Sequence, residues 1–154
     1  DMEGVAVFNL YELSQEIAFN VDEWSKIISD ASAVIYQFPF YWMSAPSLLK
    51  KWQDEVFTFL SKTPAVAGKP LTVVTTTGSE YEAYRSGGRN RFTTDELLRP
   101  YQVNAIHSGM SWQTPIVVYG MGTADAGKNI AEGANLYKQR VEMLIGSSNA
   151  GNNW

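Results

Sequence analysis

The sequence predicts an α/β fold in which a parallel sheet carries helices on both faces. Short apolar runs alternate with longer segments whose apolar residues recur every three or four positions. The apolar runs show little polar alternation, which is typical of strands covered on both sides. Strands that strictly alternate with helices imply parallel pairing through right-handed crossovers. We expect one domain over residues 1–145 and a flexible tail at 146–154, rich in Gly, Ser and Asn.

The first elements follow from local patterns. Val5 to Asn9 reads as a strand, and residues 21–29 have the apolar spacing of a helix. The next strand is predicted at 33–37, where Ala, Val, Ile and Tyr dominate, and Pro39 should end it.

A helix is expected next, at about 47–60. Pro46 suits a first helical turn, where a missing N–H costs nothing, and Ser44 is placed to cap that turn. One apolar stripe along this helix should lie on the sheet; it consists of Leu48, Leu49, Trp52, Val56, Phe59 and Leu60.

Four large side chains occupy the turn between this strand and this helix: Phe40, Tyr41, Trp42 and Met43. They could fill a corner of the core, or they could form a platform for a flat ring at the end of the sheet where such folds bind ligands. The residues alone leave both interpretations open.

The second half begins with an apolar, β-branched strand at 71–75, followed by a long loop at 76–92. Thr93 and Glu96 have the spacing of a capping box, which opens a helix that Pro100 should bend. A last strand at 116–119 and a last helix at about 130–145 complete the pattern.

Composition excludes several classes of function. The net charge of −4 and a pI near 5.0 argue against nucleic-acid binding, which needs clustered cations. There is no cysteine and one histidine, so thiol chemistry, histidine-rich metal cages and hydrolytic triads have no basis, and no metal is expected. No apolar run approaches the roughly 20 residues of a membrane span. Arg85, Arg89 and Arg91 could meet a ligand phosphate or line a solvated loop.

Three ordered motifs resemble the flavodoxin-like NAD(P)H:quinone oxidoreductases, a group that includes the modulator-of-drug-activity proteins and the ancillary reductase subunits of potassium efflux systems. The first motif is Phe38-Pro39-Phe40-Tyr41-Trp42-Met43-Ser44-Ala45-Pro46. The second runs from Thr75-Thr76-Thr77-Gly78-Ser79 to Tyr84, and the third is Glu96-Leu97-Leu98-Arg99-Pro100 with Ser108-Gly109-Met110. The resemblance implies a flavodoxin-like fold, although the family's first strand and phosphate loop have no counterpart here.

The same resemblance implies a site. A non-covalent flavin, FMN or FAD, would lie between the turn formed by Pro39, Phe40, Tyr41, Trp42 and Met43 and the loop formed by Thr76, Thr77, Gly78 and Ser79. NAD(P)H would reduce it, and a quinone would then be reduced by two electrons in a ping-pong cycle, with Tyr84 accommodating charge. Further implications are a homodimer, a cytoplasmic location, no membrane insertion and peripheral association with a transporter.

Three departures from the family pattern concern the site. Residues 58–69 form a shorter connection than usual and lack the tyrosine of the family's flavin lid, and Ser79 replaces a glycine. The resemblance to the potassium-efflux subunits and the missing phosphate loop leave a non-catalytic regulatory or interaction protein of the same shape as an alternative function. An electron-carrier flavodoxin is a third interpretation, which the long loop at 76–92 disfavours.

Overall fold

The sheet is parallel throughout, which confirms the predicted fold class. The structure is a computed structural model that describes residues 2–13 and 18–150. The central strand β2 (Pro70–Thr76) pairs with β1 (Val34–Pro39) over the whole of β1. Its other edge pairs with β3 (Ser111–Trp112) near the beginning of β2 and with β4 (Ile116–Val118) near its end.

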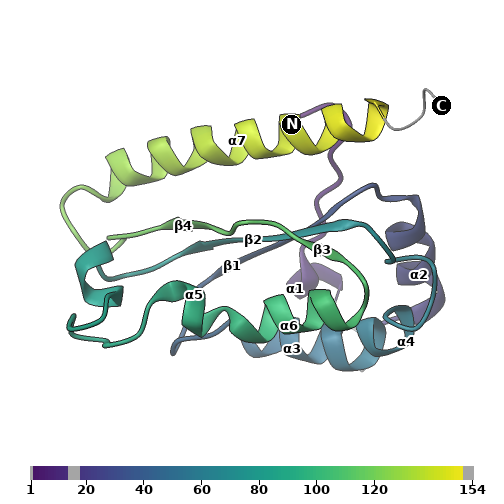
Figure 1. The fold of residues 1–154 in the computed structure, drawn as a ribbon, viewed down its shortest axis with the longest axis horizontal. Coiled ribbons are helices and arrows are strands. Elements are labelled where there is room, and N and C mark those ends of the chain that lie inside the picture. The colour runs from purple at the N-terminus through teal and green to yellow at the C-terminus, as the bar shows by residue number, and fades with distance from the viewer. Residues whose placement is uncertain (1, 14–17, 151–154) are drawn as a thin grey trace.

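Helices cover both faces of the sheet (Figure 1). The helix α7 (Ala126–Ala150) lies along one face, and α3 (Ser47–Trp52) and α6 (Arg99–His107) lie along the other. The remaining helical segments are α1 (Leu10–Leu13), α2 (Val21–Asp30), the π-helical η1 (Gln53–Phe57), α4 (Thr58–Leu60), the 3-10 turn η2 (Tyr81–Tyr84) and α5 (Thr94–Leu97).

The main core lies between the sheet and the layer of α3 and α6. Leu71 and Val73 of β2 are completely buried at its centre. Tyr36 of β1 packs edge-on against Trp52 of α3, with 5.9 Å between ring centroids, and against Tyr101 of α6 at 6.5 Å. These aromatic contacts join both helices to β1 and so fix the loops at the carboxyl end of that strand.

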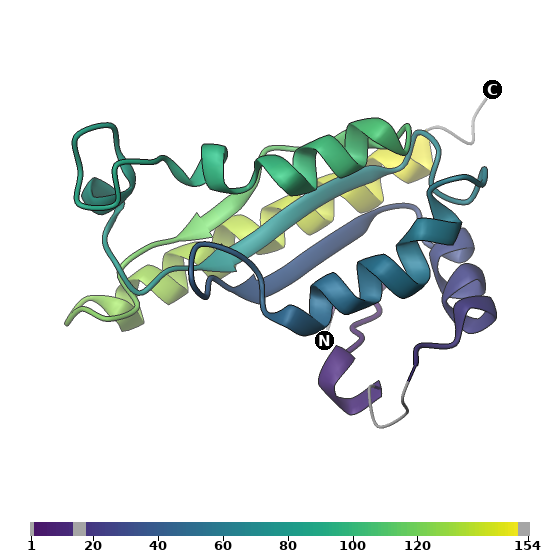
Figure 2. The same cartoon turned by 90° about the horizontal axis from the view of Figure 1, so that it is seen from below.

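The predicted strand from Val5 to Asn9 is wrong. This segment is extended but unpaired among the described residues, and the Val7 side chain is 84% exposed. A strand needs a neighbour for its N–H and C=O groups, and apolar residues alone do not supply one. Figure 2 shows the segment and α1 beyond the β1 edge of the sheet.

Several helix boundaries also differ from the predictions. The helix expected at 47–60 begins at Ser47 with Pro46 as the residue before it, and Ser44 makes no capping hydrogen bond. The Thr93 and Glu96 capping box is present, but Pro100 separates two helices at Leu98 rather than bending one, because its ring is accommodated best in a first turn.

Residues 146–150 of the predicted tail are helical, because α7 continues through residue 150. Small and polar residues lower helix propensity without ending a helix that is already formed. Residues 151–154 lie outside the described part of the chain.

Candidate functional site

The two segments predicted to hold the ligand meet at the carboxyl ends of β1 and β2. Parallel pairing places Pro39 directly opposite Thr76. Immediately beyond, the Phe40 N–H donates to the Thr76 carbonyl oxygen at 2.9 Å. The aromatic turn and the Thr76–Ser79 loop are therefore neighbours in space, where open α/β sheets bind ligands.

The aromatic turn is tight and conformationally costly. Tyr41 and Ser44 exchange two backbone hydrogen bonds, of 2.9 and 3.0 Å, and close it as an antiparallel bridge. Between them, Trp42 and Met43 have left-handed backbone angles, with φ of 47° and 62°. Each such non-glycine residue costs on the order of 1–2 kcal/mol. The turn therefore persists only because its surroundings hold it.

Most side chains of this turn point to solvent. Trp42 is 98% exposed, and Tyr41 and Met43 are also exposed, whereas Phe40 packs against the core. The sequence left open whether these four side chains fill a corner of the core or form a platform for a flat ring. Only Phe40 fills a corner of the core. The other three side chains form an exposed apolar surface beside the end of the sheet.

The Thr76–Ser79 loop is held from behind by the segment that follows β4. The Thr77 side chain is completely buried, and the backbone N–H of Thr77 donates to the Val118 carbonyl oxygen at 2.9 Å. The backbone N–H groups of Gly120 and Gly122 donate to the carbonyl oxygens of Ser79 and Gly78, both at 2.9 Å.

The other side of Gly78 is open. A Cβ atom added there would meet no atom within 4 Å. Nothing in the protein itself therefore requires glycine at this position, and the space beside it is available to another molecule.

Tyr84 lies behind the turn, at the end of η2. Its side chain is buried, and its ring lies 6.1 Å from that of Phe40 and 5.9 Å from that of Tyr119. The Tyr119 and Thr94 hydroxyl oxygens are 2.7 Å apart, and burial raises the pKa of the Tyr119 hydroxyl. The Tyr84 hydroxyl makes no hydrogen bond to another described residue.

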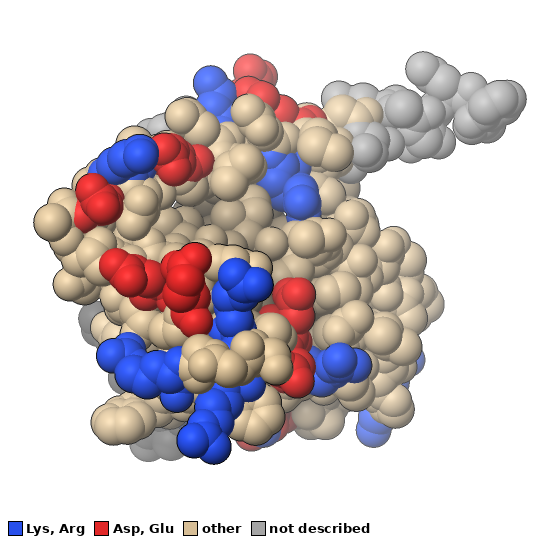
Figure 3. Space-filling model, turned by 60° about the vertical axis from the view of Figure 1, so that its left-hand side comes forward, with Lys and Arg blue, Asp and Glu red and all other residues tan. Residues whose placement is uncertain are grey.

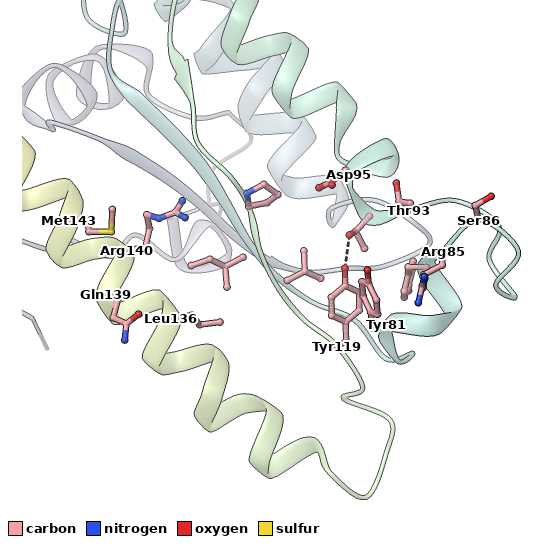
Figure 4. Close-up of a pocket in the computed structure, with 15 residues that line it drawn as sticks. Tyr81, Arg85, Ser86, Thr93, Asp95, Tyr119, Leu136, Gln139, Arg140 and Met143 are labelled. Atoms are coloured by element: carbon pink, nitrogen blue, oxygen red, sulfur yellow. Dashed lines mark hydrogen bonds between the residues drawn. The ribbon is translucent and has the colours of Figure 1, made fainter.

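A pocket of about 620 Å³ opens on the outer side of this tyrosine cluster, along β4 (Figure 4). Its walls come from η2, the start of α5, β4 and α7, and Tyr84 alone among the predicted site residues lines it. Figure 3 shows this side of the molecule hollowed, with basic and acidic side chains around the rim.

Two arginines line this pocket. The guanidinium of Arg85 lies 5.5 Å from the centre of the Tyr81 ring, and Arg140 donates to the Thr114 carbonyl oxygen at 2.7 Å. Of the loop arginines, Arg89 instead donates to the Ser79 hydroxyl at 2.5 Å. The loop arginines therefore lie in different places: Arg89 supports the predicted loop, and Arg85 faces the pocket.

Sequence reasoning missed the residues that support the predicted segments from other elements. Helical spacing predicts only that Tyr101 faces inward, and Tyr119 stands at the end of an apolar strand as part of the third family motif, so the sequence assigns neither hydroxyl a partner. Their hydroxyl contacts, with Thr94 and with the aromatic turn, arise from packing between distant elements.

Other kinds of site are absent from the described residues. No group of three or more His, Cys, Asp or Glu side chains could hold a metal ion in that part of the chain. None of its helices has the length and apolar character needed to cross a bilayer.

The parallel sheet, its helix layers and the loops gathered at its carboxyl end define an open-sheet α/β protein, a class whose members bind ligands at that end of the sheet. A family model described as the flavodoxin-like fold matches residues 2–141, so the chain belongs to that family. This confirms the resemblance drawn from the three motifs.

Curated relatives carry several names. General stress protein 14 of Bacillus subtilis (strain 168) is 35% identical over 145 residues, covering 92% of this chain and 82% of that protein. The uncharacterized NAD(P)H oxidoreductase YdeQ of the same organism is 34% identical, covering 91% and 73%. The potassium-efflux ancillary protein KefG of Serratia proteamaculans (strain 568) is 35% identical, covering 77% and 67%.

Solved structures are similar as well. A thermophilic tryptophan halogenase from Streptomycin violaceusniger has a TM-score of 0.84 and 36% identity, covering 92% of this chain and 84% of that one. General stress protein 14 from Treponema denticola, in complex with FMN, has a TM-score of 0.78 and 27% identity, covering 88% and 79%. An NADPH-quinone reductase from P. pentosaceus has a TM-score of 0.66 and 30% identity, covering 75% and 72%.

Proposed function

We propose that this chain is a flavin-dependent NAD(P)H oxidoreductase that reduces quinone-like acceptors by two-electron, ping-pong hydride transfer. The observation that carries the proposal is the meeting of the exposed aromatic turn with the open side of Gly78 at the carboxyl ends of β1 and β2. The aromatic turn offers apolar ring faces on one side of this site, and the Thr76–Ser79 loop offers backbone polar groups on the other. A flat, polar-edged ring needs both.

The residues present fit a flavin. The turn residues Pro39, Phe40, Tyr41, Trp42 and Met43 would hold one side of the ring, and Thr76, Gly78 and Ser79 would hold its polar edge. Thr77, which the sequence also assigned to that edge, is completely buried, and its N–H and hydroxyl donate to the Val118 and Ser79 carbonyl oxygens, so it would support the loop from behind. FMN is favoured over FAD, because the Treponema relative was solved with FMN. When bound, FMN supplies the hydride acceptor and donor for exchange between NAD(P)H and a quinone.

The protein's own part in this chemistry is placement and charge. Tyr84 would direct its unpaired hydroxyl toward charge that develops during hydride transfer. Tyr119 is less suited to that task, because its hydroxyl already contacts the Thr94 hydroxyl. Buried packing between Phe40 and Tyr119 would hold the Tyr84 ring in one orientation.

The proposed assembly is a homodimer. Val103 and Ile106 lie on the outer side of α6 and are 55% and 63% exposed, an apolar pair that a partner would cover. Exposed Trp42 and Met43 add to the apolar surface of the same chain. Use of NAD(P)H would place the dimer in the cytoplasm.

A second candidate is a non-catalytic interaction protein at the membrane periphery. The similarity to KefG supports this candidate, because that relative is named as an ancillary protein of a potassium-efflux system. Such a protein would keep the fold and could keep the flavin without turning over.

One experiment separates the candidates. FMN is titrated into the purified protein and binding is followed by quenching of flavin fluorescence; the complex is then mixed with NADPH or NADH in a stopped-flow instrument, and a soluble benzoquinone is added. Binding, bleaching of the flavin band and its return with the quinone support the oxidoreductase. Binding without bleaching favours the interaction protein, and absence of binding contradicts the flavin site.

A further inference from the structure

The aromatic turn needs an external support. Its two left-handed residues, Trp42 and Met43, are both exposed, so burial of their side chains does not offset the backbone cost. The two hydrogen bonds between Tyr41 and Ser44 close the turn but do not attach it to the rest of the protein.

A tyrosine from another element supplies an attachment. The Tyr101 hydroxyl oxygen accepts a hydrogen bond from the backbone N–H of Ala45 at 3.1 Å. The same oxygen lies 3.3 Å from the Ser44 hydroxyl, and either group can donate. Tyr101 therefore contacts the last residue of the turn and the residue that follows it.

Tyr101 is itself rigidly placed. It lies in α6, its side chain is only 6% exposed, and its ring packs 5.3 Å from that of Phe38 and 6.5 Å from that of Tyr36. Both partners belong to β1, the strand that leads into the turn. The ring contacts thus set the hydroxyl relative to the strand, and the hydroxyl sets the turn.

We infer that Tyr101 is a positioning residue for the flavin platform: its hydroxyl holds the Tyr41–Ser44 turn in the left-handed conformation to which the flavin binds. This inference rests on the proposed function for the identity of the ligand. The part that concerns the turn can be measured without any ligand.

The test uses Tyr101→Phe, which keeps the ring and removes only the hydroxyl. In the flavin-free protein, amide hydrogen exchange of Ala45 should become about fivefold faster or more, with no change at the central-strand residue Val73. In the FMN titration, the dissociation constant should rise by about 5- to 10-fold, the effect of losing one hydrogen bond. The visible absorption band of bound FMN should also change shape.

Two further variants separate positioning from general stability. Tyr36→Phe is the matched control, because it alters the same aromatic layer and its hydroxyl makes no hydrogen bond with the turn; FMN affinity should stay the same. Ser44→Ala should weaken FMN binding less than Tyr101→Phe, and the double variant should bind no more weakly than Tyr101→Phe, because both changes remove one linked contact.

The outcomes are distinguishable. If the parent protein binds no FMN, the proposed function fails and the flavin part of the inference fails with it, while faster exchange at Ala45 would still support the attachment of the turn. If the parent binds FMN and Tyr101→Phe binds it equally tightly with an unchanged spectrum, the positioning role is wrong and the proposed function stands. A variant that loses global stability by urea unfolding but keeps FMN affinity also overturns the positioning role.

Discussion

The ring of Tyr84 packs edge-on against the ring of Phe40, with 6.1 Å between their centroids and 66° between their planes. Phe40 belongs to the aromatic turn after β1, and Tyr84 to the loop after β2. This contact joins the two segments on which the proposed flavin site depends, and it involves the Tyr84 ring and not its hydroxyl.

Tyr84→Phe should therefore separate packing from chemistry. The ring contacts with Phe40 and Tyr119 survive, so FMN affinity and stability should be nearly unchanged. Loss of a hydroxyl directed at developing charge should slow flavin reduction by NAD(P)H by about 10²-fold. Stopped-flow bleaching of the flavin band measures this rate, and a variant that reduces as fast as the parent would assign Tyr84 a structural role.

Substitution of Gly78 should affect FMN affinity and not stability, whereas substitution of Gly88 should affect stability. Gly78→Val places its Cβ in open space, so urea unfolding should change little while FMN affinity is lost. Gly88→Ala is the control, because its Cβ would lie 2.2 Å from the Glu82 carbonyl oxygen, and the protein should lose about 1–3 kcal/mol of unfolding free energy. Tight FMN binding by a folded Gly78→Val protein would exclude Gly78 from the cofactor site.

Replacing Trp42 should change the stability of the protein and its FMN affinity in opposite directions. Trp42→Gly relieves a φ of 47° and removes a side chain that is almost wholly exposed, so the flavin-free protein should gain about 1 kcal/mol of stability. FMN affinity should fall, because a ring face of the platform is lost. Urea unfolding and FMN titration on the same sample measure both effects. Unchanged affinity would show that the indole does not contact the flavin.

The apolar side of α6 predicts the oligomeric state. We expect sedimentation to show a dimer at micromolar concentration and a monomer when Val103 and Ile106 are both replaced by Glu, because each carboxylate would be desolvated at the interface. Leu136→Glu on α7 is the control, since Leu136 is similarly exposed on the opposite face of the sheet, and the dimer should persist. A parent protein that sediments as a monomer would contradict the assembly.

Acid should weaken the capping box at the start of α5. The backbone N–H and hydroxyl of Thr93 both donate to Glu96 at 2.8 Å and hold the pKa of that carboxyl below its usual range. A carboxyl whose pKa is lower when folded stabilises the protein above its unfolded pKa of about 4.3, and this contribution is lost as pH falls through the folded value. Urea unfolding of the parent and Glu96→Gln at pH 7 and pH 3 should therefore show a stability difference that shrinks at acid pH.

Elements with a complete local signal were predictable from the sequence. The β2 strand, α2 and the Thr93–Glu96 capping box each depend on residues adjacent in the chain, and each was predicted close to its observed place. The segment from Val5 to Asn9 has the composition of a strand, but composition does not provide the neighbouring strand that its backbone groups require. The short β3 strand has too few residues to show any alternation.

The candidate site divides in the same way. Sequence motifs alone identified the aromatic turn, the Thr76–Ser79 loop and Tyr84 as segments of interest. Only the tertiary structure placed Pro39 opposite Thr76, the Phe40 ring against Tyr84 and the Tyr101 hydroxyl under the turn. The physical reason is that a motif is a property of consecutive residues, whereas these contacts depend on the register of two parallel strands and on the packing of α6 against β1.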